Sequence, residues 1–392
     1  MLDLIQIVLL LYLTLGGLYW LLTLYSMVQI IRRVPRLDKL TLAEPTDWPG
    51  VTIIVAACNE EADAEHAARS LLAIDYPNLE VMLVDDRSTD RTGEILDRVA
   101  AGDRRAKVLH IKELPEGWLG KLNAMQQASR AATTEWLLFT DGDVHFEPQA
   151  LRKAMSYAAL HGLDHLCAYP GLWPNSLLLD SMVIAFLRQL GLALRLWKVN
   201  DPTSDRFMGV GAFNLVRRTA LERAGGFEPL RMEVGDDAAL GMILRGSGAR
   251  QNLVNACTLM GLHWYRSVGQ MARGVERGFA SVGKCSAART LFFPFVLLGL
   301  ELSIYVGLLP LGLPAVQWIA AGLLAAFLGV SFAACRWAGN RFLAVFLTPL
   351  AEIVTAGLSI RAGILGWRRG GIVWRGTLYK SDVLKAGAKI RF

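Results

Sequence analysis

Long hydrophobic runs lie near both ends of the chain, and shorter ones recur between them. Residues 4–31, LIQIVLLLYLTLGGLYWLLTLYSMVQII, contain no charged side chain, and about 20 apolar residues are enough to cross a bilayer. A cleaved signal peptide would need a basic start, a shorter apolar core and a small-residue cleavage site, none of which is present here. We therefore expect residues 1–34 to form a transmembrane helix.

Three more apolar runs occupy residues 291–367. The first two, at 291–314 and 315–335, each have spanning length and predict a transmembrane hairpin. The third, at 342–367, contains a proline, a glutamate and an arginine, so we expect it to be re-entrant or interfacial. Glu301 lies in the first run, where a carboxylate is costly in lipid, and it should face protein or a polar cavity.

Between these ends, short apolar or β-branched runs alternate with segments rich in helix-forming residues. The runs that predict strands are at 51–57, 80–86, 106–111 and 135–143. Because each is followed by a helical segment, we expect an α/β domain with a mostly parallel sheet.

Residues 176–199 are apolar but also charged. Arg188 and Arg195 are seven residues apart, so they lie on one face of a helix. Such a helix can lie at the membrane interface or pack as a core helix of the soluble domain, and the sequence favours neither.

Composition and charge agree with a membrane protein. Of 392 residues 53% are hydrophobic, and the mean hydropathy of +0.34 exceeds what a soluble domain needs. Arg32, Arg33 and Arg36 follow the first helix, so the positive-inside rule places the middle domain in the cytosol of a multi-pass cell-membrane protein.

The net charge of +6 is concentrated in a basic tail, residues 368–392, which we expect to be cytosolic. Either anionic lipid headgroups or topology determination explains this tail; no groove-reading motif accompanies it, so we expect no nucleic acid. The five cysteines lie far apart without C-x-x-C or metal-ligand spacing, which predicts reduced, buried thiols.

Two pairs of carboxylates stand at predicted strand ends, Asp85 with Asp86 and Asp141 with Asp143. In a parallel sheet the ligand crevice lies at the carboxyl ends of the strands, so the pairs should share one crevice. Residues two apart in an extended chain point the same way, so Asp141 and Asp143 can converge on Mg²⁺ or Mn²⁺. A D-x-D by itself is also common in solvated turns.

Further motifs accompany this D-x-D. ACNEE ends the first strand, VDDRSTD ends the second, GWLGKLNA follows the third, and GDDAALGMILRGSG comes about 90 residues after the D-x-D. Together they resemble glycosyltransferase family 2 over residues 51–283, whose members have a GT-A fold and use sugar nucleotides as donors. The resemblance implies a nucleotide-sugar-binding half at 50–165 and an acceptor-side half with interfacial helices at 166–290.

The resemblance also implies roles in binding a UDP-sugar. The residues implied to hold the uridine are Ala57, Glu60, Asp85 and Asp86. Asp141 and Asp143 are implied to contact the ribose and the metal. Lys121 would lie near the diphosphate, where a cation offsets charge, unless it is only a solvated lysine at a helix start.

On the acceptor side, residues 209–227 resemble a family segment whose glycines let the backbone approach the sugar closely. The residues singled out there are Gly211, Gly225, Gly226 and Phe227. EVGDDAALG resembles the family's E-D motif, with Asp236 in the Glu position and Asp237 as the base that accepts the acceptor proton. The alternative is that both aspartates cap a helix that begins at Ala238. The reaction implied is an in-line displacement with inversion, with the metal stabilising the departing diphosphate.

Processive polysaccharide synthases of the family carry Q-x-x-R-W, but here Gln270 and Arg273 are followed by Gly274. Trp264 or Trp118 could supply the missing ring. DDAALG, WYRSVGQMARGVERGF and GGIVWRGTLY instead resemble a membrane branch that includes hopene-associated, carotenoid and ceramide-type lipid glycosyltransferases. This likeness implies transfer of a single sugar to a membrane lipid.

Two alternatives remain open. One is a processive polysaccharide or polyprenyl-phosphate sugar synthase. The other is a non-catalytic membrane partner subunit, against which the full set of acids argues because a binding module has no use for a base. His263 stands beside aromatic residues and is expected to be a packed interfacial residue.

Overall fold

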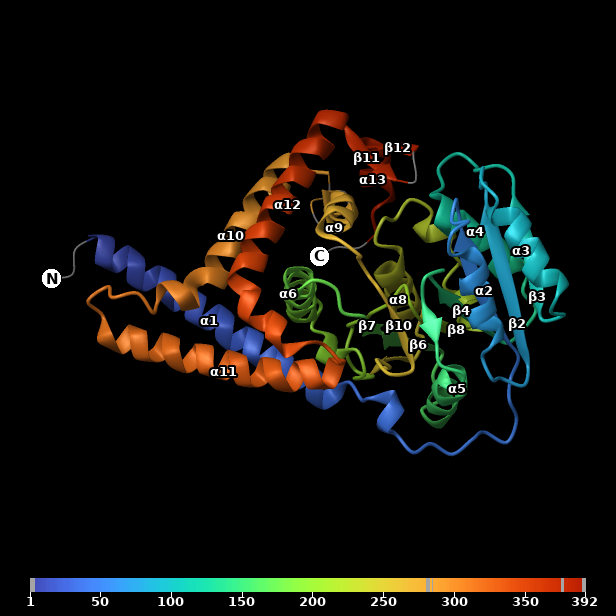
Figure 1. The fold of residues 1–392 in the computed structure, drawn as a ribbon, viewed down its shortest axis with the longest axis horizontal. Helices are drawn as coiled ribbons and strands as arrows, with labels where there is room; N and C mark the ends of the chain where they lie inside the picture. The colour runs from blue at the N-terminus through green and yellow to red at the C-terminus, as the bar shows by residue number, and fades with distance from the viewer. Residues whose placement is uncertain (1–3, 280–282, 284, 375–376, 390–392) are drawn as a thin grey trace.

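The computed structural model describes residues 4–279, 283, 285–374 and 377–389, with a soluble domain at one end and a group of long helices at the other (Figure 1). The strands are β1 (Val51–Ala57), β2 (Leu79–Asp86), β3 (Ala106–Ile111), β4 (Trp136–Thr140), β5 (His145–Phe146), β6 (His165–Tyr169), β7 (Gly171–Leu172), β8 (Asn214–Arg217), β9 (Gln251–Asn255), β10 (Met260–Leu262), β11 (Gly371–Trp374) and β12 (Thr377–Lys380). The helices of the soluble domain are α2 (Ala64–Leu72), α3 (Thr92–Ala101), α4 (Gly120–Ala131), α5 (Ala150–Leu160), α7 (Arg218–Arg223) and α8 (Asp236–Gly246), whereas α9 (Val268–Val275) packs against two of the long helices.

The central sheet has seven strands in the order β3-β2-β1-β4-β8-β6-β9. Only β8 runs antiparallel to its neighbours, β4 and β6, so the expected mostly parallel α/β sheet is confirmed. The four strands expected from sequence are β1 to β4, and all seven residues of β1 are buried. A strand buried on both faces needs a continuous apolar run, which is the pattern that predicted it.

Helices cover both faces of this sheet. Ile53 and Val55 of β1 pack in one core cluster with α2, α3 and α5, whereas Ile54 and Ala56 pack in a second with α4, α7 and α8. This division follows from the alternation of side chains along a strand. The second cluster also contains Ile372 and Leu384, so the C-terminal segment with β11, β12 and α13 (Ser381–Gly387) packs on the soluble domain.

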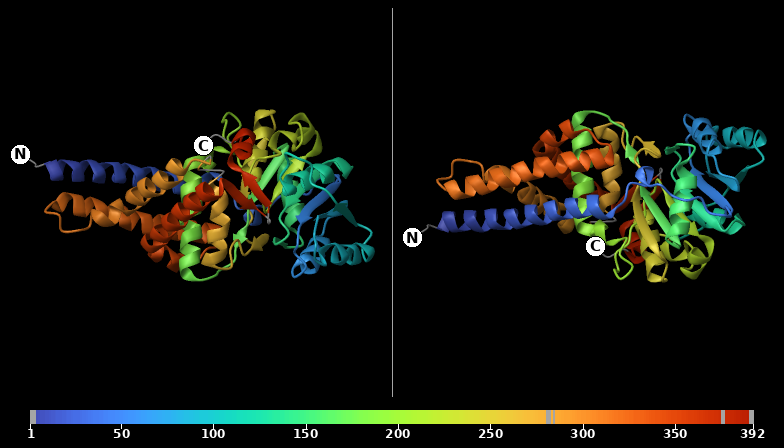
Figure 2. Two further views of the ribbon diagram at one scale, coloured as in Figure 1. Left: turned by 90° about the horizontal axis from the view of Figure 1, so that it is seen from above. Right: turned by 90° about the horizontal axis from the view of Figure 1, so that it is seen from below.

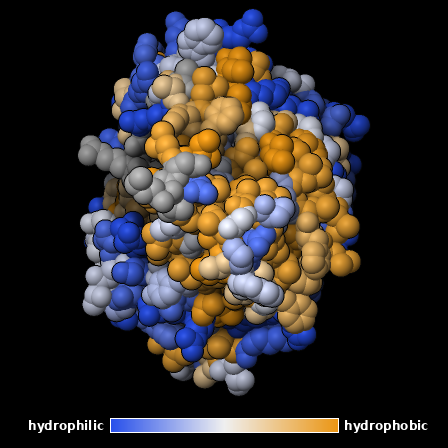
Figure 3. Space-filling model, turned by 90° about the vertical axis from the view of Figure 1, so that its left-hand side faces the viewer, coloured by the Kyte–Doolittle hydropathy of each residue, from blue (hydrophilic) through white to orange (hydrophobic). Residues whose placement is uncertain are grey.

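Among the described residues, five helices are long and apolar enough to cross a membrane. They are Leu4–Arg33 (α1), Leu177–Leu194 (α6), Ala288–Val306 (within α10, Ala287–Val306), Pro314–Ala338 (α11) and Phe342–Arg369, which comprises a 3₁₀ segment, Phe342–Leu347, and α12, Thr348–Arg369. The face that these helices present is largely hydrophobic (Figure 3), and Ile5 and Trp318 are each more than three-quarters exposed. Apolar exposure on this scale indicates contact with lipid.

Three of the five helices are oriented differently from α1 and α11. Figure 2 shows α6 running across the direction of α1 and α11, and Figure 1 shows α10 and α12 inclined to them. Arg341, just before α12, forms a hydrogen-bonded ion pair with Asp180 of α6, and β11 follows α12 directly. Both ends of α12 therefore adjoin segments packed near the soluble domain.

The ends of α1 and α11 meet on the soluble domain, at a junction formed by Val34, Pro35, Asn255 and Trp337. Trp337 Nε1 donates to Val34 O at 3.2 Å. The Asn255 backbone N–H donates to Pro35 O at 2.8 Å, and Asn255 Nδ2 donates to Trp337 O at 2.6 Å. This junction fixes both helices relative to β9.

All five cysteines are free, as expected. Cys167, Cys285 and Cys335 are buried, but Cys58 and Cys257 are partly exposed, so the expectation of burial is wrong for these two. Cys58 directly follows β1, where the chain leaves the sheet. In the basic tail, Arg375 and Arg391 lie outside the described residues.

Candidate active site

A cavity of about 1020 Å³ runs from the carboxyl end of β4 to the long apolar helices. Its polar end is lined by Glu60, Lys121, Asp141, Asp143, Asp236 and Asp237, and its other end by residues of α1, α6 and α11. This position at the strand ends is where ligand sites of open α/β sheets lie.

Three aspartates surround one lysine at the polar end. Lys121, the second residue of α4, places Nζ 3.0 Å from Asp141 Oδ1, 2.9 Å from Asp236 Oδ2 and 3.5 Å from Asp237 Oδ1. The Lys121 side chain is only 11% exposed, so the interpretation as a solvated helix-start lysine is wrong. Lys121 and Asp237 are 116 residues apart in the sequence, yet they belong to one charged cluster.

Burial and mutual repulsion shift the pKa values in this cluster. Burial, and then the charge of Asp236, raise the pKa of Asp237 to about 7, although Lys121 opposes the shift. Burial alone would lower the pKa of Lys121, but Asp141, Asp236 and Asp237 raise it well above its usual value. Asp237 is therefore a carboxylate with a pKa in the range useful for a general base.

The local structure around the aspartates differs from expectation in two ways. The strand β4 ends at Thr140, and Asp141 to Asp143 form a turn rather than the end of an extended strand. Asp236 and Asp237 are the first two residues of α8, whose N-cap is Gly235, so the capping alternative is wrong. Carboxylates in the first turn of a helix are nevertheless favoured by the helix dipole.

Gly211 lies between two of the aspartates. Its carbonyl accepts a hydrogen bond of 3.1 Å from the Asp141 N–H. A Cβ at this position would lie 2.6 Å from Oδ2 of Asp141 and 2.6 Å from Oδ2 of Asp237. The absence of a side chain is therefore what allows the two carboxylates to approach the same space.

Buried polar side chains hold the strap, residues 208–211, against Asp237. Asn214 Oδ1 accepts from the Val210 N–H at 3.1 Å, and Gln251 Oε1 accepts from the Met208 N–H at 2.9 Å. His165, fully buried, lies between Asn214 and Gln251 at 3.1 and 2.5 Å. Sequence reasoning missed all three, because an isolated His, Asn or Gln in a strand carries no motif.

Only some of the residues predicted to bind the sugar nucleotide line the cavity. Glu60 lines the cavity, whereas Ala57, Asp85 and Asp86 are not among its described lining residues. Asp85 accepts from the Ser88 N–H at 3.2 Å and faces His110 at 3.1 Å. Asp86 is fully buried and pairs with Arg87 at 2.8 Å. The expected shared crevice is therefore not seen for Asp85 and Asp86.

Of the residues predicted on the acceptor side, some line the cavity and others do not. Gly211, Trp264, Gln270 and Arg273 line the cavity, but Gly225, Gly226 and Phe227 do not. Gly225 and Gly226 have φ of 85° and 66°, so they are needed for a left-handed turn rather than for close approach to a sugar. Phe227 is buried, and its N–H donates to Gln126 Oε1 at 2.7 Å.

Aromatic rings line the cavity beside Gly274. Trp264 and Tyr265 stack with ring centroids 5.3 Å apart, and a Cβ on Gly274 would lie 2.6 Å from the Tyr265 hydroxyl. Trp118 is buried in the core and is not among the described lining residues. Of the two rings proposed to replace the missing tryptophan, only Trp264 is in position.

The donor set fits a divalent cation that shares its ligands with a phosphate. Asp141 and Asp143 line the cavity with His263, whose buried Nδ1 has no hydrogen-bond partner among the described residues. Within the described residues, no three His, Cys, Asp or Glu side chains form a group that could hold a metal alone. Mg²⁺ or Mn²⁺, bound through one or two carboxylates plus phosphate oxygens and water, matches this arrangement.

Comparisons with known proteins agree with this fold. The family model described as glycosyl transferase family 2 matches residues 52–224. A beta-monoglucosyldiacylglycerol synthase of Synechocystis sp. is 33% identical over 119 residues, 30% of this chain and 24% of the relative. One of Nostoc sp. is 38% identical over 97 residues, 24% of this chain and 20% of the relative. The chain thus spans about a quarter of the length of these curated relatives.

Among solved structures, the mannosyltransferase PcManGT of Pyrobaculum calidifontis, in complex with GDP-Man and Mn²⁺, has a TM-score of 0.52. The match covers 89% of this chain and 99% of that one at 19% identity, so it shows a shared fold. The soluble domain therefore has the GT-A type of fold. Its similarity to glycosyl transferase family 2 covers residues 52–224, which is less than half of the chain.

Proposed function

We propose that this protein is an inverting, metal-dependent glycosyltransferase that moves one sugar from a UDP-sugar to a membrane lipid. The observation that carries the proposal is the single cavity that joins the aspartate cluster to an apolar end lined by α1, α6 and α11. A sugar nucleotide needs the polar end, and a lipid needs the apolar end. The names of the curated relatives support a diacylglycerol as the first acceptor to test.

In the proposed reaction, Asp237 accepts the proton of the acceptor hydroxyl as its oxygen attacks the anomeric carbon. The carbon to diphosphate bond breaks as the new bond forms on the opposite face, which gives inversion. Asp141 and Asp143 would hold Mg²⁺ or Mn²⁺, which supplies positive charge to the departing diphosphate. Lys121 orients the acids and adds a cation near the same position.

The donor and membrane roles are part of the same proposal. Glu60, which lines the cavity, would contact the nucleotide. The protein is multi-pass in the cell membrane, with the soluble domain cytosolic because Arg32 and Arg33 end α1 on that side. Nucleotide sugar then meets the lipid at the cytosolic face.

Gly274 favours single addition over processive synthesis. Tyr265 occupies the space next to Gly274 where the processive pattern has a tryptophan. The set of Asp141, Asp143 and Asp237 around Lys121 also argues against a non-catalytic partner subunit, because such a subunit would not need a base.

The test is release of nucleoside diphosphate by purified protein in detergent, with UDP- and GDP-sugars, Mg²⁺ or Mn²⁺, and diacylglycerol or host lipid extract. We expect lipid-dependent release with one UDP-sugar and a single-sugar glycolipid by mass spectrometry. Asp237→Asn should lower this rate by about 10²–10⁴-fold, the usual contribution of a general base.

Asp205→Asn is the matched control, since the Asp205 side chain is 85% exposed and pairs with Arg206 rather than with Lys121. Its rate should equal that of the natural protein. Nucleotide binding without turnover for every sugar and lipid would overturn the enzyme proposal. A polymeric product would favour the processive alternative.

A further inference from the structure

The apolar end of the cavity is a chamber between three helices. Its lining residues are Met27, Ile30 and Ile31 of α1, Ile184, Leu187 and Leu190 of α6, and Phe327, Ser331, Ala334, Cys335 and Ala338 of α11. On α11 these residues recur every three or four positions and so share one face. From Phe327 to Ala338 they extend over about 16 Å at 1.5 Å per residue. The chamber is therefore long and narrow, and follows α11 away from the soluble domain.

Small side chains create the space in this chamber. Between Phe327 and Trp337 the lining residues of α11 are Ser331, Ala334 and Cys335. The neighbouring Phe332 is exposed on the other face of the helix. From residue 331 to 335 the small side chains thus point inward and the large one points to the outside.

Arg188 and Phe327 form the end of the chamber that lies farthest from the soluble domain, and we call this end the floor. Arg188 and Phe327 line the cavity, and directly behind them Trp20 lies 4.8 Å from the Phe327 ring and 5.2 Å from the Arg188 guanidinium. Trp20 is fully buried. The chamber therefore ends at the level of Phe327 within the group of membrane helices.

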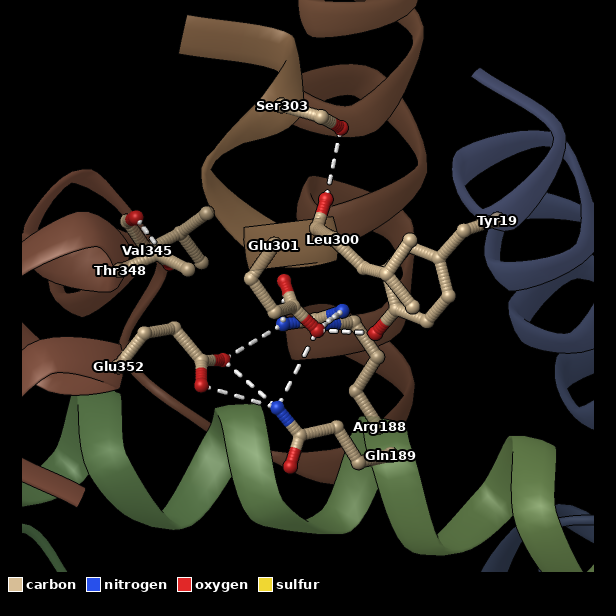
Figure 4. Close-up of polar contacts among 9 residues, drawn as sticks. All are labelled: Tyr19, Arg188, Gln189, Leu300, Glu301, Ser303, Val345, Thr348 and Glu352. Atoms are coloured by element: carbon tan, nitrogen blue, oxygen red, sulfur yellow. Dashed lines mark hydrogen bonds and ion pairs between the residues drawn. The ribbon is translucent and has the colours of Figure 1, made fainter. Parts of the chain in front are cut away.

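The guanidinium of Arg188 is fully engaged by carboxylates (Figure 4). Its Nη1 and Nη2 donate to Glu301 at 2.8 Å each, and Nη2 donates to Glu352 at 3.0 Å. Gln189 Nε2 and the Tyr19 hydroxyl donate to the same carboxylates. Two acids therefore face one cation, and the floor offers no free positive charge to a lipid phosphate.

We propose that this chamber holds one hydrocarbon chain of the acceptor lipid and that its floor limits the length of that chain. The inference rests on the proposed function, because the same cavity leads to Asp237. The apolar walls match a hydrocarbon chain, and the excess negative charge behind the floor disfavours a phosphate headgroup. The acceptor hydroxyl then lies at the polar end while its chain lies along α11.

The first test measures transfer to dioctanoyl-, dimyristoyl- and dioleoylglycerol in phosphatidylcholine vesicles. Ala334→Phe should fill the chamber and lower kcat/KM for the long-chain acceptors by roughly tenfold or more. Phe327→Ala should deepen the chamber and raise the ratio of long-chain to short-chain transfer. Ala333→Phe is the matched control, because Ala333 is exposed on the opposite face of α11.

The second test does not depend on turnover. A diacylglycerol with a photoreactive diazirine at the chain end should crosslink to residues 327–338 of the natural protein and of Ala333→Phe, but not of Ala334→Phe. Phosphatidylcholine that carries the same chain should crosslink there far less.

Equal crosslinking by phosphatidylcholine, or a pattern unchanged in Ala334→Phe, would overturn the chamber proposal. Chain-length preferences identical in all variants would do the same. Absence of sugar transfer by the natural protein would instead count against the proposed function, and the crosslink would still decide whether the chamber holds the chain.

Discussion

At the residue scale, Lys121 balances only part of the negative charge around it. Asp141, Asp236 and Asp237 all lie within 3.5 Å of its Nζ, and Asp143 adds a fourth carboxylate to the cavity wall. Such an excess is costly in a partly buried site unless a cation joins it. The charge of the cluster therefore favours binding of a divalent cation.

Gly211→Ala should abolish most activity without unfolding the protein. The added Cβ would lie 2.6 Å from both Asp141 and Asp237, so at least one carboxylate must move, and a displacement of about 1 Å can cost about a hundredfold in rate. Transfer rates and the thermal midpoint would be measured together. Gly246→Ala, where a Cβ meets nothing within 4 Å, should keep full activity; equal rates in the two variants would refute the role of Gly211.

His165 should make the protein less stable in acid. Burial lowers the pKa of His165 to about 4 from 6.5. The folded state therefore resists a proton that the unfolded state accepts below about pH 6.5. The contribution of neutral His165 to the free energy of unfolding is complete above about pH 6.5. It is lost as the pH falls to about 4, and the loss amounts to up to about 3 kcal/mol.

Unfolding in detergent, followed by tryptophan fluorescence from pH 7.5 down to 4.5, would measure this effect. His165→Gln, which keeps a polar side chain between Asn214 and Gln251, should show a shallower loss than the natural protein. Parallel pH dependences in the two proteins would contradict the assignment to His165.

The sequence predicted the cluster of aspartates around Lys121 better than it predicted the donor and acceptor contacts. Asp141, Asp237 and Lys121 come from three separate motifs, and the structure brings them together. Asp85, Gly225 and Phe227 also stand in motifs, yet local demands explain them: a buried hydrogen bond, a left-handed turn and core packing. A motif alone does not separate these demands from ligand binding.

At the element scale, Arg188 links α6 to the membrane helices α10 and α12. Arg188→Ala would leave Glu301 and Glu352 buried without their cation, and breaking a buried pair in this way usually costs about 3–5 kcal/mol. We expect a large loss of thermal stability in detergent. Lys198→Ala, which removes an exposed charge next to the same helix, should change stability by no more than about 0.5 kcal/mol.

A variant that also neutralises Glu301 and Glu352 distinguishes a loss of charge pairing from a loss of packing. Combining Arg188→Ala with Glu301→Gln and Glu352→Gln should recover part of the lost stability, because no unpaired charge remains. If the triple variant is less stable than Arg188→Ala alone, the loss comes from packing against Trp20 and Phe327 rather than from charge.

The sequence predicted the strands that have a simple hydrophobic pattern. The strands β1 to β4 contain short apolar or β-branched runs and were found. Neither the short antiparallel β8 nor the packing of residues 371–387 on the soluble domain was predicted. Ile372 and Leu384 stand among charged residues, and only contacts distant in sequence bury them.

At the scale of the whole molecule, the proposed topology places the soluble domain and the α10–α11 loop on opposite sides of the membrane. Leu311→Cys in that loop should react with an impermeant maleimide in intact cells, whereas Glu113→Cys in the soluble domain should react only after lysis. Cys58 and Cys257 would be replaced by serine, since both are partly exposed. Labelling of both sites in intact cells, or of neither, would contradict the proposed orientation.

The junction of Val34, Asn255 and Trp337 also has a consequence for biosynthesis. The hydrogen bond between Val34 and Trp337 joins residues 303 positions apart, so α1 leaves the ribosome long before its partner exists. At about 5–20 residues per second the interval is about 15–60 s. During that time the nascent α1 must stay in the bilayer beside an unfinished domain, and the junction can close only when α11 has been inserted.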